Sequence, residues 1–452
     1  MSRPTRLAFP EARKNKLGDL HAGFRPYAQA GSTALATISL ESLHPCLWFS
    51  GAEACNTIMQ QAEVYRKDTS GYDVIAFHGP NIVTSEGATW KRHRHAVRAS
   101  FSEKNYALVW DESGRVTEQW FEYLEVGCKG NIEVDVVDSF RKVTLNVIAS
   151  AGFGQHFPWN TPAADENSPG LHFSTSIIDS VERIFWRALT PRWAYSLPIP
   201  QISKTMFAFN EMERHIENLI HEARQAAVTE ESQNPVASGS LLKGLLEAND
   251  ELEGDSRLSD RELLSNIFIF LFAGHETSAH TLSFVMAIFA LYPDIHAAVR
   301  EEADKVWPDP AAHKKSTYKS DFVRLPYTLA LFYETLRHFP AEPVLPRIAS
   351  QDTVLLATKR KEGLMTSEHT DQRFTVVVPR GTVVVPDLYA MHMNTQYWGP
   401  TAPEFDPTRF LSTNWPKHAF APFAGGPRAC IGRGFATAES VRIIARVAQT
   451  WD

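Results

Sequence analysis

A long apolar stretch in mid-chain, residues 267–292, places the strongest constraint on how this sequence can fold. Five polar or ionisable residues interrupt it: His275, Glu276, Thr277, Ser278 and His280. Burying such groups in lipid is costly, so the stretch predicts a core helix rather than a membrane span. Pro293 is expected to end this helix, because proline cannot continue the backbone hydrogen bonding.

The composition is that of a soluble globular protein. The chain has 452 residues, of which 44% are hydrophobic and 21% charged, and its net charge is −7. No basic excess points to nucleic acid as a partner. The first 16 residues include basic side chains, but no apolar segment follows them, so no secretory signal peptide is expected.

The four cysteines contain no C-x-x-C pair: Cys46, Cys55, Cys128 and Cys430. This spacing argues against a disulfide framework and indicates a reducing compartment. We expect the first three to be buried thiols without a chemical role.

Hydrophobic periodicity predicts a mainly helical fold. Besides the core helix, four segments have helical periodicity: 108–126, 207–227, 327–338 and 435–447. Two short strand-like runs, 374–378 and 382–385, flank Pro379-Arg380-Gly381 and are predicted to pair as a hairpin. Solvated linkers are expected at 229–240 and 247–256. Since strands do not alternate with helices, the fold class is mainly α with a small β part.

Cys430 lies in a glycine-rich turn, residues 420–434, just before a predicted helix. Free N–H groups and the helix dipole there favour a thiolate, and a thiolate on haem iron promotes O–O cleavage. Arg428 can pair with an anionic propionate, and Phe423 can cover the thiolate side of the ring. Four glycines allow a tight turn or close approach to a planar group: Gly425, Gly426, Gly432 and Gly434.

For a lone cysteine in such a turn, a buried free thiol is the favoured interpretation. Two other kinds of site are less consistent with the sequence. A phosphate-binding loop requires G-x-x-x-x-G-K-S/T, which does not occur in the sequence. A zinc site requires several closely spaced ligands, and no Cys or His lies within eight residues of Cys430.

The string Phe423-x-x-Gly426-x-Arg428-x-Cys430-x-Gly432 resembles the haem-binding signature of the cytochrome P450 family at every fixed position. The resemblance extends from about residue 33 to 447. It implies the cytochrome P450 fold, a helical bundle around a buried haem with a small β-rich subdomain. It also implies that residues 1–452 form a single domain and that Cys430 binds the iron of heme b, iron protoporphyrin IX.

The core helix carries Ala273-Gly274-His275-Glu276-Thr277, which matches a second motif of the family. An acid and a hydroxyl in an apolar helix can relay protons by general acid catalysis, and Gly274 makes room for a flat ligand and a diatomic molecule. The resemblance implies this role for Glu276 and Thr277, and contact with the haem for Ala273 and Gly274.

A zinc protease would require His-Glu-x-x-His, with the two histidines four residues apart. His280 lies five residues after His275, so the two would point roughly 140° apart on a helix.

Further basic residues match haem-propionate ligands of the family. Trp90 and Arg94 lie one helical turn apart in Trp-Lys-Arg-His-Arg, although this basic segment alone would be interpreted as a surface face. Arg347 follows a proline-rich segment and matches another propionate ligand. The family also implies a buried, structural network that supports the cysteine turn, formed by Glu334, Arg337 and Arg409.

The sequence is similar to fungal microsomal members of the family. Those members usually begin with a membrane-anchoring helix and end in a hairpin that closes the substrate pocket. We expect no such anchoring helix in this sequence, and we expect no hairpin because only 22 residues follow Cys430. A cytoplasmic location, or one on the cytoplasmic face of the endoplasmic reticulum with peripheral membrane contact, is therefore expected.

The resemblance implies a monooxygenase that inserts one atom of O2 into a small hydrophobic substrate of secondary metabolism. Electrons would come from a separate NADPH–cytochrome P450 reductase, because no Rossmann fingerprint follows a strand. Two alternatives remain open: a reductase-independent enzyme that rearranges peroxides, and a haem-binding protein without catalysis. Four segments are expected to line an apolar pocket: 70–81, 173–207, 270–274 and 343–345.

Overall fold

The computed structural model describes residues 23–38, 44–127, 133–159, 170–229, 241–309, 312–359 and 372–451. The chain forms two compact units, which are considered separately. The first unit comprises residues 1–71 and 330–430, and the second comprises residues 72–329 and 431–452. The mainly helical fold class predicted from the sequence is confirmed.

The first unit contains the β-structure. Its five-stranded sheet has the order β1 (Ala34–Ile38), β2 (Pro45–Phe49), β7 (Val383–Pro386), β4 (Arg347–Ala349) and β3 (Tyr65–Lys67). Neighbouring strands are antiparallel except β2 and β7, which are parallel with Trp48 opposite Val385. A second sheet pairs β5 (Thr353–Lys359) with β6 (Gln372–Val378).

The predicted hairpin over 374–378 and 382–385 is wrong. The turn at Pro379 does form, with Thr382 N–H donating to the Pro379 carbonyl at 3.1 Å. However, β6 before the turn pairs with β5, whereas β7 after it pairs with β2 and β4 in the other sheet. The turn therefore passes the chain between sheets, and long-range partners decide the pairing.

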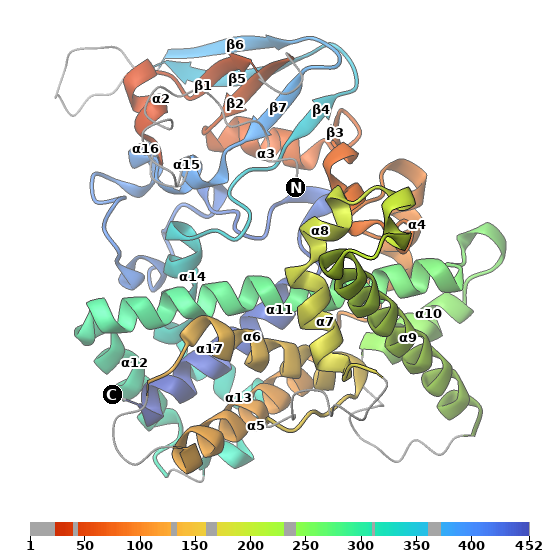
Figure 1. Ribbon diagram of the computed structural model, residues 1–452. Coiled ribbons are helices and arrows are strands. Elements are labelled where there is room, and N and C mark those ends of the chain that lie inside the picture. Colours follow the sequence, from red (N-terminus) through yellow and green to blue (C-terminus); the bar gives the residue numbers. More distant parts are fainter. Residues whose placement is uncertain are drawn as a thin grey trace. The chain divides into compact units, whose positions relative to one another are not determined.

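Helices complete the first unit: α2 (Arg25–Ala30), α3 (Ala52–Gln60), α15 (Leu388–His392), α16 (Thr395–Trp398) and most of α14 (Pro326–His338). Helix α3 packs on both sheets, as Figure 1 shows. The buried side chains between them form one apolar cluster that includes Phe49, Ile58, Met59 and Val384. The predictions of buried thiols at Cys46 and Cys55 are confirmed, while Cys128 lies outside the described residues.

The second unit is helical. Its longer helices are α4 (Gly87–Arg98), α5 (Glu103–Gly127), α6 (Val136–Val147), α7 (Phe173–Glu182), α9 (Pro200–Thr229), α10 (Leu241–Asp250), α11 (Asp260–Leu291), α12 (Pro293–Val306) and α17 (Arg433–Thr450). Helices α8 (Ile184–Leu189) and α13 (Tyr318–Asp321) are short. Helix α6 packs along α11, and α17 packs against α5 and α12 (Figure 1).

Helix α11 confirms the predicted core helix but begins earlier than its apolar stretch. Ser259 caps it in a capping box with Glu262, which satisfies N–H groups of the first turn. All residues of 262–271 are buried. Pro293 starts α12, so the predicted helix end is also confirmed.

No single helix in the described ranges has both the length and the hydropathy to cross a bilayer. One bent pair, Gly254–Leu291 with Pro293–Val306, passes that test together, with 111° between its parts.

The predicted linkers are partly wrong. Helix α10 extends to Asp250, so the first residues of 247–256 are helical. Most of the other linker, 230–240, lies outside the described residues.

Candidate active site

The cysteine turn is built in the first unit from short backbone contacts. The N–H of Cys430 donates to the carbonyl of Phe423 at 2.9 Å, which closes the turn. Ala424 has φ 56°, the one positive φ of a non-glycine residue in the described part of the chain, and Gly426 follows with φ 67°. Cys430 is exposed, unlike the buried Cys46 and Cys55. The closed turn therefore fixes the backbone position of Cys430.

Two glycines of the motif region are needed for close contacts within the protein. A β-carbon at Gly426 would meet the backbone of Met59 on α3. A β-carbon at Gly434, in the first turn of α17, would lie 2.3 Å from the ring of Tyr106. These positions tolerate no side chain without a shift of their neighbours, which gives a structural reason for both glycines.

The buried network expected beneath the turn is present. Arg337 donates to both carboxylate oxygens of Glu334, with Nε–Oε2 2.6 Å and Nη2–Oε1 2.7 Å, and both side chains are fully buried. Arg409 Nε lies 3.7 Å from the Glu334 carboxylate. Burial raises the pKa of Glu334, but hydrogen bonds from Arg337 and His338 lower it more, to about 2. The carboxylate is therefore ionised and paired.

His392 links this network to the cysteine turn. Its carbonyl accepts a hydrogen bond from Arg337 Nη1 at 3.0 Å, and its Nε2 accepts one from the N–H of Ala421 at 3.0 Å. Burial and the charge of Arg337 lower the pKa of His392 to about 3, so its ring is neutral and can accept this hydrogen bond. The sequence motif indicated Glu334, Arg337 and Arg409 but gave no signal for His392.

In the second unit, the predicted acid–hydroxyl motif on α11 contains both exposed and buried residues. Ala273 and Thr277 are exposed and lie one turn apart, and the Thr277 hydroxyl donates to the Ala273 carbonyl at 2.9 Å. Gly274 lies against Ile148, in a π-helical segment after α6, where a β-carbon would be 2.3 Å from Cδ1. Gly274 therefore also permits close helix packing.

Glu276 points toward α6 and is held there by basic groups. Arg141 Nε lies 3.2 Å from its Oε1, and His275 and His280 lie 3.6 and 3.5 Å from the carboxylate. Burial raises the pKa of Glu276, but the hydrogen bond and charge of His275, with the charges of Arg141 and His280, lower it below its usual value. The motif indicated Glu276 and left Arg141 unrecognised, because α6 carries no local signal for this partner.

The basic residues of helix α4 differ in their structural roles. Arg92 donates to Glu262 on α11 at 2.9 Å, and this pairing lowers the pKa of Glu262 to about 2 against burial, which raises it. Arg92 therefore ties two helices together. Trp90 and Arg94 are half-buried and lie one turn apart in α4, as their spacing predicts.

The remaining predicted residues are distributed over both units. Arg347 is buried at the start of β4, where its Nη1 donates to the Pro346 carbonyl at 2.9 Å. Arg428 is half-buried in a 3₁₀ turn, and Gly432 caps α17. The first unit thus contains Arg347, Phe423, Gly426, Arg428 and Cys430. The second unit contains Trp90, Arg94, Ala273, Gly274, Glu276, Thr277 and Gly432.

The donor chemistry fits a haem better than a metal held by protein groups alone. Across the described ranges, no three His, Cys, Asp or Glu side chains are grouped so that they could hold a metal ion. An exposed thiol without such co-ligands is suited to an iron whose other ligands come from a macrocycle.

Comparison with known proteins decides the family. The sequence signature described as Cytochrome P450 matches residues 42–452. The chain belongs to the cytochrome P450 family. Membership implies a haem (iron protoporphyrin IX) with a thiolate ligand, and oxidoreductase chemistry.

The named relatives of this cytochrome P450 include fungal monooxygenases and a bacterial protein. Cytochrome P450 monooxygenase 124 of Postia placenta is 33% identical over 404 residues, which cover 88% of this chain and 74% of the relative. Cytochrome P450 monooxygenase ORF6 of Penicillium roqueforti is 26% identical, over 88% of this chain and 72% of the relative. A Bacillus subtilis protein named Bifunctional cytochrome P450/NADPH--P450 reductase 2 is 28% identical, over 83% of this chain and 32% of its own length.

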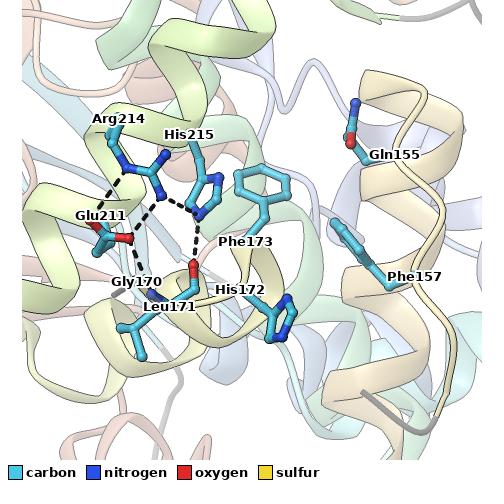
Figure 2. A pocket seen from close by; sticks show the side chains of 9 residues that line it. All are labelled: Gln155, Phe157, Gly170, Leu171, His172, Phe173, Glu211, Arg214 and His215. Atoms are coloured by element: carbon cyan, nitrogen blue, oxygen red, sulfur yellow. Dashed lines mark hydrogen bonds and ion pairs between the residues drawn. The ribbon is translucent and has the colours of Figure 1, made fainter. Parts of the chain in front are cut away.

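A pocket of about 580 Å³ in the second unit lies apart from the predicted site residues. Figure 2 shows that α7, α9 and the segment around Phe157 line it. Several of its polar groups pair with one another: Glu211 accepts hydrogen bonds from Arg214 at 2.8 Å and from the N–H of Leu171 at 3.1 Å. His215 contacts the carbonyl of Leu171 at 2.7 Å. None of the residues predicted to bind haem or move protons lines this pocket.

Proposed function

We propose that this cytochrome P450 uses a haem ligated by Cys430 to insert one oxygen atom from O2 into a small hydrophobic molecule. The observation that carries the proposal is the closed turn that holds Cys430 just before α17, within the family signature. The proposal treats residues 1–452 as one functional domain, because its site residues come from both units.

In this proposal the haem, when bound, supplies the binding and reduction of dioxygen. Phe423 keeps water from the thiolate side, and the backbone at Ala273, Gly274, Gly426 and Gly432 allows close approach of the ring. Four basic or donor side chains bind the propionates: Trp90, Arg94, Arg347 and Arg428. Thr277 holds a proton at its hydroxyl, and Glu276 exchanges protons at its carboxylate.

The test is the absorption spectrum of the reduced, carbon-monoxide-bound protein. The wild type is expected to show the red-shifted band of a thiolate-ligated haem, and Cys430→Ala to lose it. Cys46→Ala is the matched control, since it removes another thiol from the same unit and should keep the band. Absence of the band from the wild type, or its survival in Cys430→Ala, would contradict the proposal.

Electrons are proposed to come from a separate NADPH–cytochrome P450 reductase. One relative carries both activities in its name, and this chain aligns with about a third of that protein. Product formation is therefore expected to require added reductase and NADPH. Turnover of an organic peroxide without any reductase, at the same rate as the complete system, would instead support the peroxide-rearranging alternative.

We also propose a peripheral membrane contact at the cytoplasmic face of the endoplasmic reticulum. Seven exposed apolar side chains within residues 185–207 support it: Phe185, Trp186, Leu189, Trp193, Leu197, Ile199 and Phe207. Aromatic and aliphatic side chains of this kind insert at the bilayer interface. Trp193→Ala, at 74% exposure, should weaken sedimentation with phosphatidylcholine vesicles, whereas Tyr123→Ala, an exposed aromatic on α5, should not.

The substrate class is proposed to be hydrophobic products of secondary metabolism, such as terpenoids, fatty acids or simple aromatics. An apolar environment on α11 supports this proposal. Phe270 is buried there against Phe101, with ring centres 5.4 Å apart. Titration with a panel of these compounds, followed by the substrate-induced shift of the haem spectrum, tests this. A response to charged sugars or nucleotides alone would contradict it.

A further inference from the structure

Arg187 on α8 is enclosed by aromatic rings from three other segments of the second unit. Its Cζ atom lies 4.3 Å from the centre of the Tyr195 ring, 5.8 Å from that of Phe209 on α9 and 5.9 Å from that of Phe77. A guanidinium within about 6 Å of a ring face is attracted by the ring electrons. The rings therefore fix this cation in an apolar setting.

The ring faces do not satisfy the N–H groups of Arg187. Its Nε and Nη1 are buried, and neither has a hydrogen-bond partner among the described residues. Arginine stays charged in proteins and has five N–H donors in a rigid plane. Because buried donors are nearly always paired, these unpaired groups require an acceptor.

The Glu213 carboxylate, which lies near this ring cluster through its contact with His78, already has other partners. Glu213, one turn after Phe209 on α9, contacts His78 at 3.4 Å and is also paired with Arg261 on α11. In the described part of the chain, no acidic side chain forms an ion pair with Arg187. No described carboxylate is thus left to accept from Arg187.

A row of rings connects Arg187 with the predicted site on α11. The Phe77 ring lies 4.9 Å from that of Phe268, and Phe268 stacks on Phe272 at 5.9 Å. Phe272 directly precedes Ala273, where the predicted acid–hydroxyl motif begins. These rings make the side of Arg187 that faces α11 apolar, so a ligand bound at Arg187 would combine an anionic end with an apolar body.

We propose that Arg187 binds the carboxylate of an otherwise apolar substrate, which rests on the proposed function and narrows its substrate class to hydrophobic acids. A carboxylate can accept two N–H bonds from one guanidinium, and its single charge matches a single cation. A phosphate dianion would leave excess charge in this apolar setting, at a larger desolvation cost.

The experiment compares acids with their methyl esters on the haem-containing full-length protein. Binding of dodecanoic acid, methyl dodecanoate, cinnamic acid and methyl cinnamate is measured by isothermal titration calorimetry. In at least one pair the wild type is expected to bind the acid about tenfold or more tightly than the ester, the scale of a charged hydrogen bond. No preference for the acid in either pair would overturn the proposal.

The variants locate the preference at Arg187. Arg187→Gln should bind acid and ester almost equally, and Arg187→Lys should keep part of the preference because it keeps the charge. Lys204→Gln removes the same charge from an exposed side chain on α9 and should leave the preference unchanged. An unchanged acid preference in Arg187→Gln would overturn the proposal. If Arg187→Gln fails to fold, Arg187→Lys decides: a full wild-type preference there overturns it.

The experiment also distinguishes binding of a substrate carboxylate from binding of lipid head groups, and it is independent of the haem assignment. If Arg187→Gln weakens binding to vesicles containing phosphatidylserine but leaves acid binding unchanged, Arg187 contacts lipid head groups and the proposal is overturned. Calorimetric binding does not depend on turnover or on the carbon monoxide spectrum. Loss of the acid preference and loss of the haem assignment are therefore distinct results.

Discussion

The carbonyl oxygen of Met59 occupies the place that a side chain at Gly426 would need. A β-carbon on Gly426 would lie 2.2 Å from this oxygen, and the φ of 67° is itself unfavourable for other residues. The obstacle is backbone of α3, which cannot move aside as a flexible side chain could. The cysteine turn can therefore pack this closely on α3 only because residue 426 is a glycine.

Gly426→Ala is expected to destabilise the protein by about 2 kcal/mol or more and to reduce its haem content, because both the left-handed backbone and the contact with Met59 oppose a methyl group. Gly425→Ala is the matched control. Its β-carbon would meet only the Met59 side chain at 3.4 Å, and its φ is −145°. Thermal unfolding and the ratio of haem to protein absorbance measure both effects. Equal behaviour of the two variants would contradict the explanation.

Arg141→Gln is expected to raise the pKa of Glu276, because it removes a positive charge 3.2 Å from the carboxylate. If ionised Glu276 is needed for turnover, the acidic limb of the pH–rate profile moves to higher pH. Arg141→Lys should keep the wild-type profile, as should Lys142→Gln, which breaks an exposed pair with Asp138 on the same helix. Glu276→Gln should lower turnover about 100-fold or more. A profile unchanged in Arg141→Gln would remove Arg141 from this role.

Glu334→Gln should destabilise the first unit strongly, by about 3–5 kcal/mol, because it leaves the buried Arg337 without its carboxylate. Glu53→Gln is the control at an exposed pair with Arg373, whose side chains are 49% and 69% accessible, and should cost less than about 0.5 kcal/mol. Urea unfolding at neutral pH measures both. Similar costs would show that the buried network contributes little.

The low pKa of Glu334 predicts that the free energy of unfolding decreases in acid. The pKa of Glu334 is about 2 in the folded chain against an ordinary value of 4.5. Its contribution is complete above about pH 4.5 and is lost as the pH falls toward 2. Unfolding measured between pH 6 and pH 3 should show this loss in the wild type and a smaller slope in Glu334→Gln.

Glu439 predicts the opposite pH dependence. It is fully buried on α17, and burial raises its pKa from 4.5 to about 8, with the Ser278 hydroxyl acting weakly in the other direction. Since neither carboxylate oxygen has a well-formed hydrogen bond in the described ranges, the burial effect dominates. Its contribution to stability is complete below about pH 4.5 and is lost as the pH rises toward 8.

Glu439→Gln should therefore unfold with a free energy that is flatter between pH 5 and pH 8 than that of the wild type, and should be the more stable protein at pH 8. Glu222→Gln, at an exposed carboxylate on α9, should follow the wild-type curve. Parallel curves for wild type and Glu439→Gln would show that the buried carboxyl ionises without penalty.

The sequence predicted what depends on local chemistry. The predicted helix over 435–447 lies within α17, and that over 327–338 lies wholly within α14, because apolar periodicity and flanking glycine or proline act over a few residues. The Glu334–Arg337 pair was predictable for the same reason, since an i,i+3 spacing places both side chains on one helix face.

The sequence could not predict contacts between distant segments. The pairing of β6 with β5 rather than β7 depends on which strand edges meet across the first unit. Arg141 approaches Glu276 from 135 positions earlier in the chain, and nothing near either residue indicates the other. The enclosure of Arg187 likewise requires three segments to converge, which local periodicity does not describe.

Contacts within the protein restrain the turn that contains Cys430. Phe423 and Cys430 close it with a hydrogen bond, and Ala424 is held in a conformation that a free chain rarely adopts. A loop restrained in this way has little conformational entropy left to lose when a ligand arrives. The thiol is thus ready for an incoming metal, and more of the energy of the new bond remains available to hold the cofactor.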